Sequence, residues 1–201
     1  MGDEFVKKEE KSLYRQDMKI TQSLKERAIK EKRSDNVFLL WIAILITFML
    51  TVLVLSTYVY VNVHVEGSSM QPTLYTNDFL VANKYKKIKH GSIIVIKDEM
   101  PDSDEWLIKR VIAMEGDKVE IKNGSVYVNG KMLDEPYAKG KTDCFFWIGE
   151  KIIGKDEFFY LGDNREYSSD SRSLGYGTCK KKQIVGVVTD WSLYFNKVFG
   201  K

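Results

Sequence analysis

The sequence predicts a mainly β fold, an antiparallel β-sheet domain that is preceded by one N-terminal transmembrane helix. The first observation is that residues 37–61 contain no Asp, Glu, Lys or Arg, whereas about 20 apolar residues are enough to cross a bilayer. The second is a series of short runs rich in β-branched residues, each bounded by Gly, Asp, Asn or Pro, as strands are. The third is a pair of Asn-Gly dipeptides, which favour antiparallel hairpins.

Residues 1–36 alternate in charge sign and carry apolar residues at a loosely helical spacing, which predicts a solvated, partly helical tail. Trp41 near one end of residues 37–61, and Tyr58 and Tyr60 near the other, suit the two interfaces of a membrane span. A buried core helix is an alternative, although the stretch is long for one. A cleaved signal peptide is another, but its apolar region would have about 7–15 residues and would lie nearer the start.

The basic residues around the span predict its orientation. Several precede it, and none occurs between Val61 and Lys84; the preceding ones are Lys25, Arg27, Lys30, Lys32 and Arg33. Cytoplasmic flanks carry an excess of Lys and Arg, so we expect the tail in the cytoplasm and residues 62–201 outside it, anchored in the cell membrane by a single pass.

Residues 62–201 are expected to form one β-rich domain. Predicted strands cover residues 79–83, 92–96, 106–112 and 184–188, and residues 119–122 and 125–128 flank the hairpin signal Asn123-Gly124. A second signal, Asn129-Gly130, follows directly. We expect residues 114–160 to be a hairpin and loop-rich insert, and residues 132–160 have no assigned role. No helical pattern of any length is evident outside the anchor region. Residues 191–199 fit either a packed final strand or a membrane contact, since Trp and Tyr favour interfaces.

The composition excludes several classes of function. A formal net charge of +3 is too small to imply a nucleic-acid partner. We expect no metal or other cofactor, because His64 and His90 are isolated and fit no zinc-ligand spacing. Cys144 and Cys179 can form one disulfide outside the membrane, but the sequence does not establish that they meet.

Ser69 and Lys109 are the residues that point to catalysis. Ser69 lies in a Gly-, Ser- and Pro-containing segment, where a turn exposes its hydroxyl and lets backbone N–H groups converge as an oxyanion site. Lys109 lies among apolar residues of a predicted strand. A lysine with the ordinary pKa is only on the order of 0.4% neutral at pH 8, and burial lowers that pKa. A neutral lysine can take the proton of a serine hydroxyl. The alternatives are an ordinary Gly-Ser turn and a solvent-facing lysine.

A third feature is the polar loop at residues 161–172, in which acidic residues and arginines alternate at close spacing. Such loops are commonly simple turns. Here the charges can form an ion-pair network that holds a hydroxyl against the lysine.

Together these segments resemble the type I signal peptidases, the bacterial Ser/Lys leader peptidases of protein export. The resemblance rests on Ser69-Met70-Gln71-Pro72-Thr73-Leu74, on Lys109-Arg110 followed by Glu115-Gly116-Asp117, on Asn77-Asp78-Phe79-Leu80-Val81, and on Gly162-Asp163-Asn164-Arg165 with Ser168 and Asp170-Ser171-Arg172. It covers roughly residues 35–195 and leaves the charged tail unmatched.

The resemblance implies the following roles. Ser69 is the nucleophile, Lys109 is the general base, and Ser168 orients the lysine amine. Charged residues that brace the site are Asp163, Asp170, Arg110 and Arg172, and residues that line shallow apolar pockets are Met70, Leu74, Leu107 and Ile108. The implied partners are preprotein signal peptides, cut after a small-x-small motif, and the lipid bilayer. We expect a monomer.

The chain also departs from the family pattern. Gly67 replaces a serine whose hydroxyl helps to stabilise the oxyanion in some relatives, so the second oxyanion donor is open. This glycine and the single span are similar to the compact Gram-positive enzymes. The endoplasmic-reticulum branch has histidine at the position of Lys109, which disfavours that branch.

Three other classes of protein fit parts of the sequence. A sortase would use Cys179 after Thr178, with His90 as partner, but no arginine follows Arg172 to complete its site. A membrane-tethered binding module would be expected to have lost Ser69 or Lys109. A soluble self-cleaving Ser/Lys regulator does not suit a membrane span.

Overall fold

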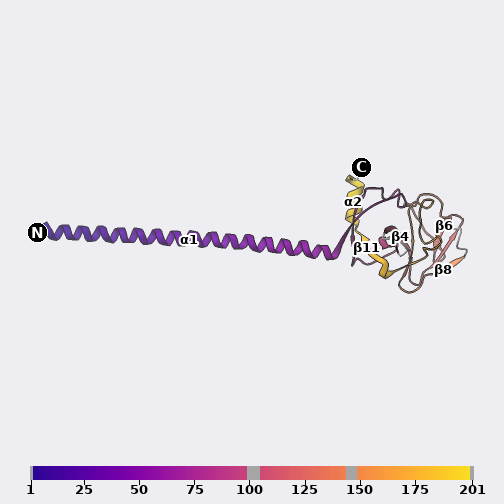
Figure 1. The fold of residues 1–201 in the computed structure, drawn as a ribbon, viewed down its shortest axis with the longest axis horizontal. Coiled ribbons are helices and arrows are strands. Elements are labelled where there is room, and N and C mark those ends of the chain that lie inside the picture. Colours follow the sequence, from indigo (N-terminus) through magenta and orange to yellow (C-terminus); the bar gives the residue numbers. More distant parts are fainter. Residues whose placement is uncertain (1, 99–104, 144–148, 200–201) are drawn as a thin grey trace. The chain divides into compact units, whose positions relative to one another are not determined.

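The computed structural model describes residues 2–98, 105–143 and 149–199, and the chain forms two compact units, Met1–Leu55 and Ser56–Lys201 (Figure 1). The helix α1 spans Gly2–Val59; its residues up to Leu55 make up the first unit, and its last residues belong to the second. Its segment Val37–Val59, with a mean hydropathy of 2.9, is long and apolar enough to cross a membrane. The next two residues of the predicted span, Tyr60 and Val61, begin strand β1.

The predicted tail, residues 1–36, is helical from Gly2 onward and not only in part. Between Asp3 and Asn36 the sequence contains no Gly or Pro and is rich in Lys and Glu. Lys and Glu are good helix formers, and the absence of breakers allows the helix to continue into the apolar segment.

The second unit is built on a seven-stranded sheet with the order β1-β2-β11-β3-β4-β9-β10. Its strands are β1 Tyr60–His64, β2 Phe79–Asn83, β3 Ile93–Lys97, β4 Trp106–Met114, β9 Glu157–Leu161, β10 Cys179–Lys180 and β11 Ile184–Val188. All of the strand pairs in it are antiparallel. The prediction of a mainly β, antiparallel fold after an N-terminal apolar helix is confirmed.

A four-stranded antiparallel sheet, in the order β7-β6-β5-β8, lies within the predicted insert. It comprises β5 Lys118–Lys122, β6 Ser125–Val128, β7 Lys131–Met132 and β8 Glu150–Ile152. The two Asn-Gly dipeptides connect β5 to β6 and β6 to β7, and all four residues have positive φ (53° and 77° in each pair). Positive φ at both central positions is the type I′ turn that Asn-Gly favours.

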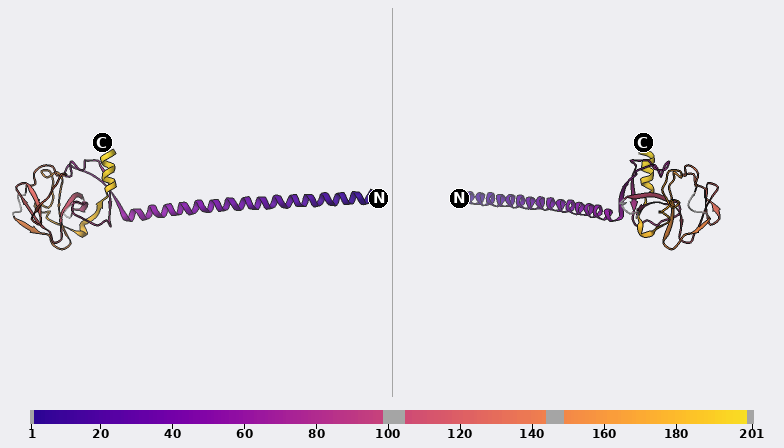
Figure 2. Two further views of the ribbon diagram at one scale, coloured as in Figure 1. Left: turned by 180° about the vertical axis from the view of Figure 1, so that it is seen from behind. Right: turned by 45° about the vertical axis from the view of Figure 1, so that its right-hand side comes forward.

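The C-terminal residues form a helix, α2, over Asp190–Phe199, after the short 3₁₀ helix η1, Lys181–Gln183. The expectation of no helix outside the anchor region was therefore wrong, and so was one of the two alternatives for residues 191–199, the packed final strand. Trp, Tyr, Phe and Val suggested a strand because they have high β propensity, but they recur at a helical spacing, and α2 packs on β2. In both views of Figure 2, α2 (yellow) lies at the rim of the β domain.

One core cluster joins the segment after β1 to the strands around it. It includes Val63 of β1, Leu80 of β2 and Ile108 of β4, together with Met70 and Leu74 from the segment between β1 and β2. Met70 and Leu74 are 2% and 1% exposed. Burial of such a side chain contributes about 1.5–3 kcal/mol, so these two residues fix the intervening turn against β4.

Candidate active site

Ser69 lies in the turn that follows β1, and its side chain is half-buried. The turn is closed by backbone hydrogen bonds from Gln71 N–H to the Ser68 carbonyl (3.1 Å) and from Leu74 N–H to the Met70 carbonyl (2.9 Å). With Met70 buried next to it, the turn presents the Ser69 hydroxyl on the side that faces β4.

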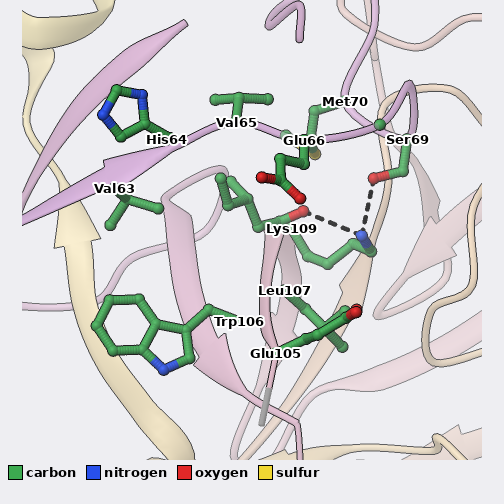
Figure 3. A pocket seen from close by; sticks show the side chains of 12 residues that line it. Val63, His64, Val65, Glu66, Ser69, Met70, Glu105, Trp106, Leu107 and Lys109 are labelled. Carbon is green, nitrogen blue, oxygen red and sulfur yellow. Dashed lines mark hydrogen bonds between the residues drawn. The ribbon is translucent and has the colours of Figure 1, made fainter. Parts of the chain in front are cut away.

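Lys109 lies in the middle of β4, and its side chain is buried, with 4% of the residue exposed. Its Nζ donates hydrogen bonds to Ser69 Oγ (2.9 Å) and to the Ile108 carbonyl (3.1 Å). Figure 3 shows the two side chains pointing toward each other across the end of a cavity. The structure thus brings together two residues that lie 40 positions apart.

Burial lowers the pKa of Lys109 to about 8, against the opposing attraction of the Asp170 and Asp163 carboxylates. Near pH 8 about half of the Lys109 amines are then neutral, which is roughly a hundredfold more than for a lysine in water. A neutral amine within hydrogen-bond distance of a hydroxyl has the geometry that a general base requires.

Asp163 and Arg110 form a largely buried bidentate ion pair close to the Ser69–Lys109 dyad. Arg110 Nε donates to Asp163 Oδ1 (2.8 Å) and Nη2 donates to Oδ2 (2.7 Å). Thr73 Oγ1 also donates to Asp163, and the Arg110 guanidinium stacks on the Tyr137 ring at 4.0 Å from its centroid. Two parallel hydrogen bonds to one carboxylate fix orientation as well as distance, so this pair connects β4 to the turn of Ser69.

Asp170 and Arg172 form the second buried pair. Arg172 Nε and Nη2 donate to the two Asp170 oxygens, each at 2.8 Å. Asp170 Oδ2 also accepts the Gly162 N–H (3.0 Å), and Arg172 Nη2 donates to the Arg165 carbonyl (2.7 Å). The polar loop is therefore an ion-pair network, as its charge pattern suggested.

The Oγ of Ser168 is buried and makes no hydrogen bond among the described residues. A Cβ built on Gly162 would come within 2.2 Å of Ser168 Oγ and 2.5 Å of the Ser69 carbonyl oxygen. The Ser168 side chain therefore packs over the glycine, close to the backbone of Ser69. The expected hydrogen bond between Ser168 and Lys109 is not formed in this structure.

Asn164 is a residue to which the sequence reasoning gave no role. Its backbone N–H donates to the Ser69 carbonyl and its side-chain amide donates to the Ser68 carbonyl, both at 3.0 Å. Asn164 therefore clamps the nucleophile turn from the opposite loop. The sequence offers no signal for this role, because the two segments lie far apart in the chain.

Arg165 also received no role. It is 3% exposed and pairs with Glu135 through two hydrogen bonds of 2.8 and 2.7 Å. Its Nε donates to the Gly162 carbonyl (3.0 Å). Arg165 thus connects the polar loop to the predicted loop-rich insert.

A cavity of about 320 Å³ extends from the dyad. The residues that line it come from two segments: Val63, His64, Val65, Glu66, Gly67, Ser69 and Met70 from β1 and the turn, and Glu105, Trp106, Leu107, Ile108 and Lys109 from β4 (Figure 3). Three of the predicted pocket residues are among them. Leu74 is not, because its side chain lies in the core cluster.

The residues of a sortase-like site are not arranged for catalysis. Cys179 is 1% exposed, and burial raises the pKa of its thiol to about 12, whereas a reactive cysteine has a lowered pKa. His90 Nε2 is hydrogen-bonded to Asp117 Oδ2 at 2.6 Å. Cys144, the other half of the possible disulfide, lies outside the described residues. In the described part of the chain, no group of three His, Cys, Asp or Glu residues could hold a metal ion.

Comparison with known proteins matches residues 38–191 to the family described as signal peptidase, peptidase S26. Signal peptidase I P of Bacillus subtilis subsp. natto is 36% identical over 79% of this chain and 90% of its own length. Signal peptidase I of Bacillus amyloliquefaciens is 36% identical over 84% of this chain and 96% of its own length. The crystal structure of a signal peptidase I from Enterococcus faecalis V583 aligns with 52% of this chain and 98% of that chain, with a TM-score of 0.41 and 26% identity.

The family match covers most of the chain and both halves of the Ser69–Lys109 pair, and only the charged N-terminal tail and the last residues lie outside it. The chain therefore belongs to the signal peptidase family, peptidase S26, as a bacterial type I signal peptidase.

Proposed function

We propose that this chain removes signal peptides from exported preproteins with Ser69 as nucleophile and Lys109 as general base. The observation that carries the proposal is the 2.9 Å contact between the buried Lys109 amine and the Ser69 hydroxyl. The lowered pKa of Lys109, about 8, supports it, because a base has to be neutral before it can accept a proton.

The reaction begins when the Ser69 O–H donates its hydrogen bond to the neutral Lys109 amine. Oγ attacks the scissile carbonyl carbon, a C–O bond forms, and the proton moves to Nζ. The tetrahedral intermediate then breaks its C–N bond, and the Lys109 ammonium returns the proton to the departing amine. A water molecule, deprotonated by the same amine, hydrolyses the acyl-enzyme and regenerates Ser69.

The negative charge that develops on the carbonyl oxygen needs a hydrogen-bond donor. The Ser69 backbone N–H lies in the turn and is proposed for this role. Gly67 offers no side-chain donor, and its φ of 81° is one that a serine rarely adopts. In this chain the oxyanion site is therefore expected to rely on backbone N–H groups.

Ser168 is proposed to orient the Lys109 amine. A buried hydroxyl with no hydrogen-bond partner costs about 1–3 kcal/mol, and the Ser168 Oγ is such a group among the described residues. Accepting a hydrogen bond from the Lys109 ammonium after proton transfer would satisfy this hydroxyl and stabilise the charged state of the base.

The substrate is proposed to bind as an added strand. Residues 106–109 of β4 pair with β3 on one edge, and β9 pairs only from Arg110 onward. β1 pairs with β2 alone among the described strands. An extended peptide can therefore form backbone hydrogen bonds in the groove between these two edges, while alternate side chains enter its pockets. Met70, Leu107 and Ile108 contribute apolar side chains to this lining, and apolar contacts suit the small side chains of a small-x-small motif.

The segment Val37–Val59 is proposed to anchor the chain in the cell membrane, with the Ser56–Lys201 unit on the extracytoplasmic face. Exported preproteins leave the bilayer on that face. An anchored enzyme therefore has its site where the cleavage motif first becomes accessible.

The test is cleavage of a synthetic preprotein with an Ala-x-Ala site by the full chain in detergent, from pH 6 to pH 10. We expect Ser69→Ala and Lys109→Ala each to lose at least about 10³-fold in kcat/KM. Wild-type activity should rise through a single pKa near 8, as Lys109 becomes neutral. Matched controls are Ser68→Ala, in the same turn, and Lys131→Ala, an exposed lysine of β7. Activity that persists in Lys109→Ala would show that another group is the base.

A further inference from the structure

Residues 133–142, which follow β7, lie in the part of the insert that has no assigned role, and we call them the brace segment. At the start of the segment, Leu133 N–H donates to the Val126 carbonyl (2.9 Å). At its end, Thr142 N–H donates to the Gly124 carbonyl (3.1 Å). Both anchor points lie in the β5–β6 hairpin, so the middle of the segment has a fixed position relative to this hairpin.

The middle of the brace segment runs beside the polar loop that carries Asn164. Lys139 N–H donates to the Asp163 carbonyl (2.7 Å), and the Lys139 carbonyl accepts the Arg165 N–H (2.9 Å). These two hydrogen bonds form a parallel bridge around Asn164, the residue whose own N–H and side-chain amide hold the Ser69 turn. The brace segment thus fixes the backbone on both sides of the Asn164 clamp.

Glu135 is the acidic partner of a buried arginine. Its carboxylate accepts two hydrogen bonds from Arg165, and the two side chains are 10% and 1% exposed. Arg165 also donates through Nε to the Gly162 carbonyl (3.0 Å) and through Nη1 to Thr142 Oγ1 (2.6 Å). A buried charge requires a partner, so Glu135 keeps this guanidinium, and with it the loop backbone at Gly162, in one position.

Tyr137 connects Glu135 to another arginine of the site. A turn closed by the hydrogen bond from Ala138 N–H to the Glu135 carbonyl (2.9 Å) brings the two side chains together, and the Tyr137 hydroxyl donates to Glu135 Oε1 (2.9 Å). Burial, together with the Glu135 carboxylate, raises the pKa of the Tyr137 hydroxyl above its ordinary value, so the hydroxyl remains a donor. The centre of the Tyr137 ring lies 4.0 Å from Cζ of Arg110. The ring therefore covers the guanidinium that pairs with Asp163.

The charges around Lys109 connect this arrangement to the dyad. Two carboxylates attract its ammonium, those of Asp163 and Asp170. Each carboxylate is paired with an arginine, Arg110 in the first case and Arg172 in the second. A change that moves Arg110 away from Asp163 leaves a less compensated negative charge near Lys109, which favours the charged amine. Water that enters beside the pair has the same effect, because burial is the main cause of the lowered pKa of Lys109.

We propose that Glu135 and Tyr137 are positioning residues for the Ser69–Lys109 dyad. Glu135 acts on the nucleophile turn through the polar loop, and Tyr137 acts on the lysine through the ion pair of Arg110. The cavity beside the dyad is lined by β1, the turn and β4, so neither side chain is expected to touch the substrate. The inference deepens the proposed function and rests on it. A purely structural segment would affect stability without changing the state of the dyad.

The first test follows Lys109 itself, by NMR of the full chain in detergent with isotope-labelled lysines; its signal is the one that Lys109→Ala lacks. Tyr137→Leu removes the ring above Arg110. We expect Lys109 then to titrate about half a pH unit or more above wild type, about a threefold gain in proton affinity. Tyr137→Phe keeps the ring and should titrate as wild type does. The matched control is Tyr127→Leu, because Tyr127 of β6 also has a cation over its ring, Lys122 at 4.4 Å.

The second test measures kinetics on the synthetic preprotein at pH 9, where most of the wild-type Lys109 amine is neutral. Glu135→Gln keeps the size of the side chain but removes the charge that pairs with Arg165. We expect kcat to fall about tenfold or more, since a displacement of about 1 Å at a catalytic group can cost about 100-fold, and KM to stay within about twofold of wild type. Glu150→Gln is the control, because the Glu150 carboxylate pairs with Lys118 at the surface of the same insert.

Wild-type titration of Lys109 in a folded Tyr137→Leu chain, or wild-type kcat in a folded Glu135→Gln chain, would overturn the proposal. Circular dichroism confirms folding, and if one of the two variants does not fold, the other decides. The NMR test needs no cleavage. If wild type cuts nothing, the proposed function fails, whereas the titration of Lys109 still decides whether Tyr137 positions the dyad.

Discussion

Lys109 combines a cost to stability with a gain in reactivity. The sequence placed it among apolar residues of a strand, and in the structure it is buried in β4 with a pKa of about 8. Burial disfavours the charged ammonium, and the carboxylates of Asp163 and Asp170 offset only part of that effect. The same desolvation that makes the amine a base therefore makes the folded state less favourable whenever the amine is protonated.

The pH dependence of stability should show this cost. The folded-state pKa of about 8 lies below the ordinary lysine value of 10.5, so the unfolded chain binds the proton more tightly and the penalty is complete below pH 8. This penalty lowers the free energy of unfolding by about 3 kcal/mol, and it disappears as the pH rises from 8 to 10.5. We expect Lys109→Met to lose activity yet to raise the melting temperature at pH 7 by several degrees, and the difference from wild type should shrink by pH 10. Thermal unfolding in detergent measures this, with Lys131→Met as control; a variant that is less stable than wild type at pH 7 would contradict it.

The sequence identified Ser69 and Lys109 because each residue has a local signal, a turn composition in one case and an apolar strand in the other. Asn164 has no such signal. Its hydrogen bonds to the carbonyls of Ser68 and Ser69 join segments that are far apart in the chain. Pairing of this kind depends on the tertiary fold, which residue spacing does not predict.

At the scale of elements, strands and turns with a clear sequence pattern were predicted well, whereas very short strands and the C-terminal helix were not. β2 and β11 coincide with their predicted ranges, and the two Asn-Gly turns lie where they were expected. β1 was partly hidden because its first residues continue the apolar run of the span. β7, β8 and β10 have only two or three residues each, too few for alternation to be visible. The helix α2 was misread because its aromatic residues favour strands.

The junction between β9 and the polar loop leaves no space for a larger residue beside the proposed catalytic serine. Gly162 directly follows β9, and its N–H is bound by Asp170. A Cβ at this position would lie 2.5 Å from the backbone carbonyl oxygen of Ser69, closer than real Cβ atoms approach, so the nucleophile turn would have to move.

We therefore expect Gly162→Ala to lower kcat about 100-fold or more, since a displacement of about 1 Å at a catalytic group has an effect of that size. Gly154→Ala is a suitable control, because the nearest atom to its Cβ, at 3.2 Å, is the flexible end of Glu157. Kinetics on the synthetic preprotein, together with circular dichroism to confirm folding, check this expectation. A folded Gly162→Ala enzyme with wild-type kcat would show that the close packing is not needed for catalysis.

At the scale of the whole molecule, the chain consists of an apolar helix, proposed as the anchor, and a β unit that carries every proposed catalytic residue. The sequence indicated this division through composition alone, since a run without charges and a series of short strands are both visible without tertiary information. The tertiary packing that brings the turn after β1 against β4 was not predictable, because it depends on how core residues such as Val63 and Ile108 contact each other.

Orientation in the membrane is the last property that the whole chain determines. The positive-inside rule counts basic residues within about 15–20 positions of a span; on the N-terminal side these include Lys25, Arg27 and Lys30, whereas Lys84 is the first after the span. Lys84 and the lysines that follow it are too distant in sequence from the span to retain that flank in the cytoplasm during insertion. We therefore expect a protease added to intact bacterial spheroplasts to remove a C-terminal epitope tag and to leave an N-terminal tag protected. Replacing the basic residues at positions 25–33 by glutamine should increase the fraction of chains in which the N-terminal tag is cut, because the charge difference across the span would disappear. Protection of the C-terminal tag in wild type would place the Ser69 site in the cytoplasm, away from exported preproteins, and would exclude the proposed function.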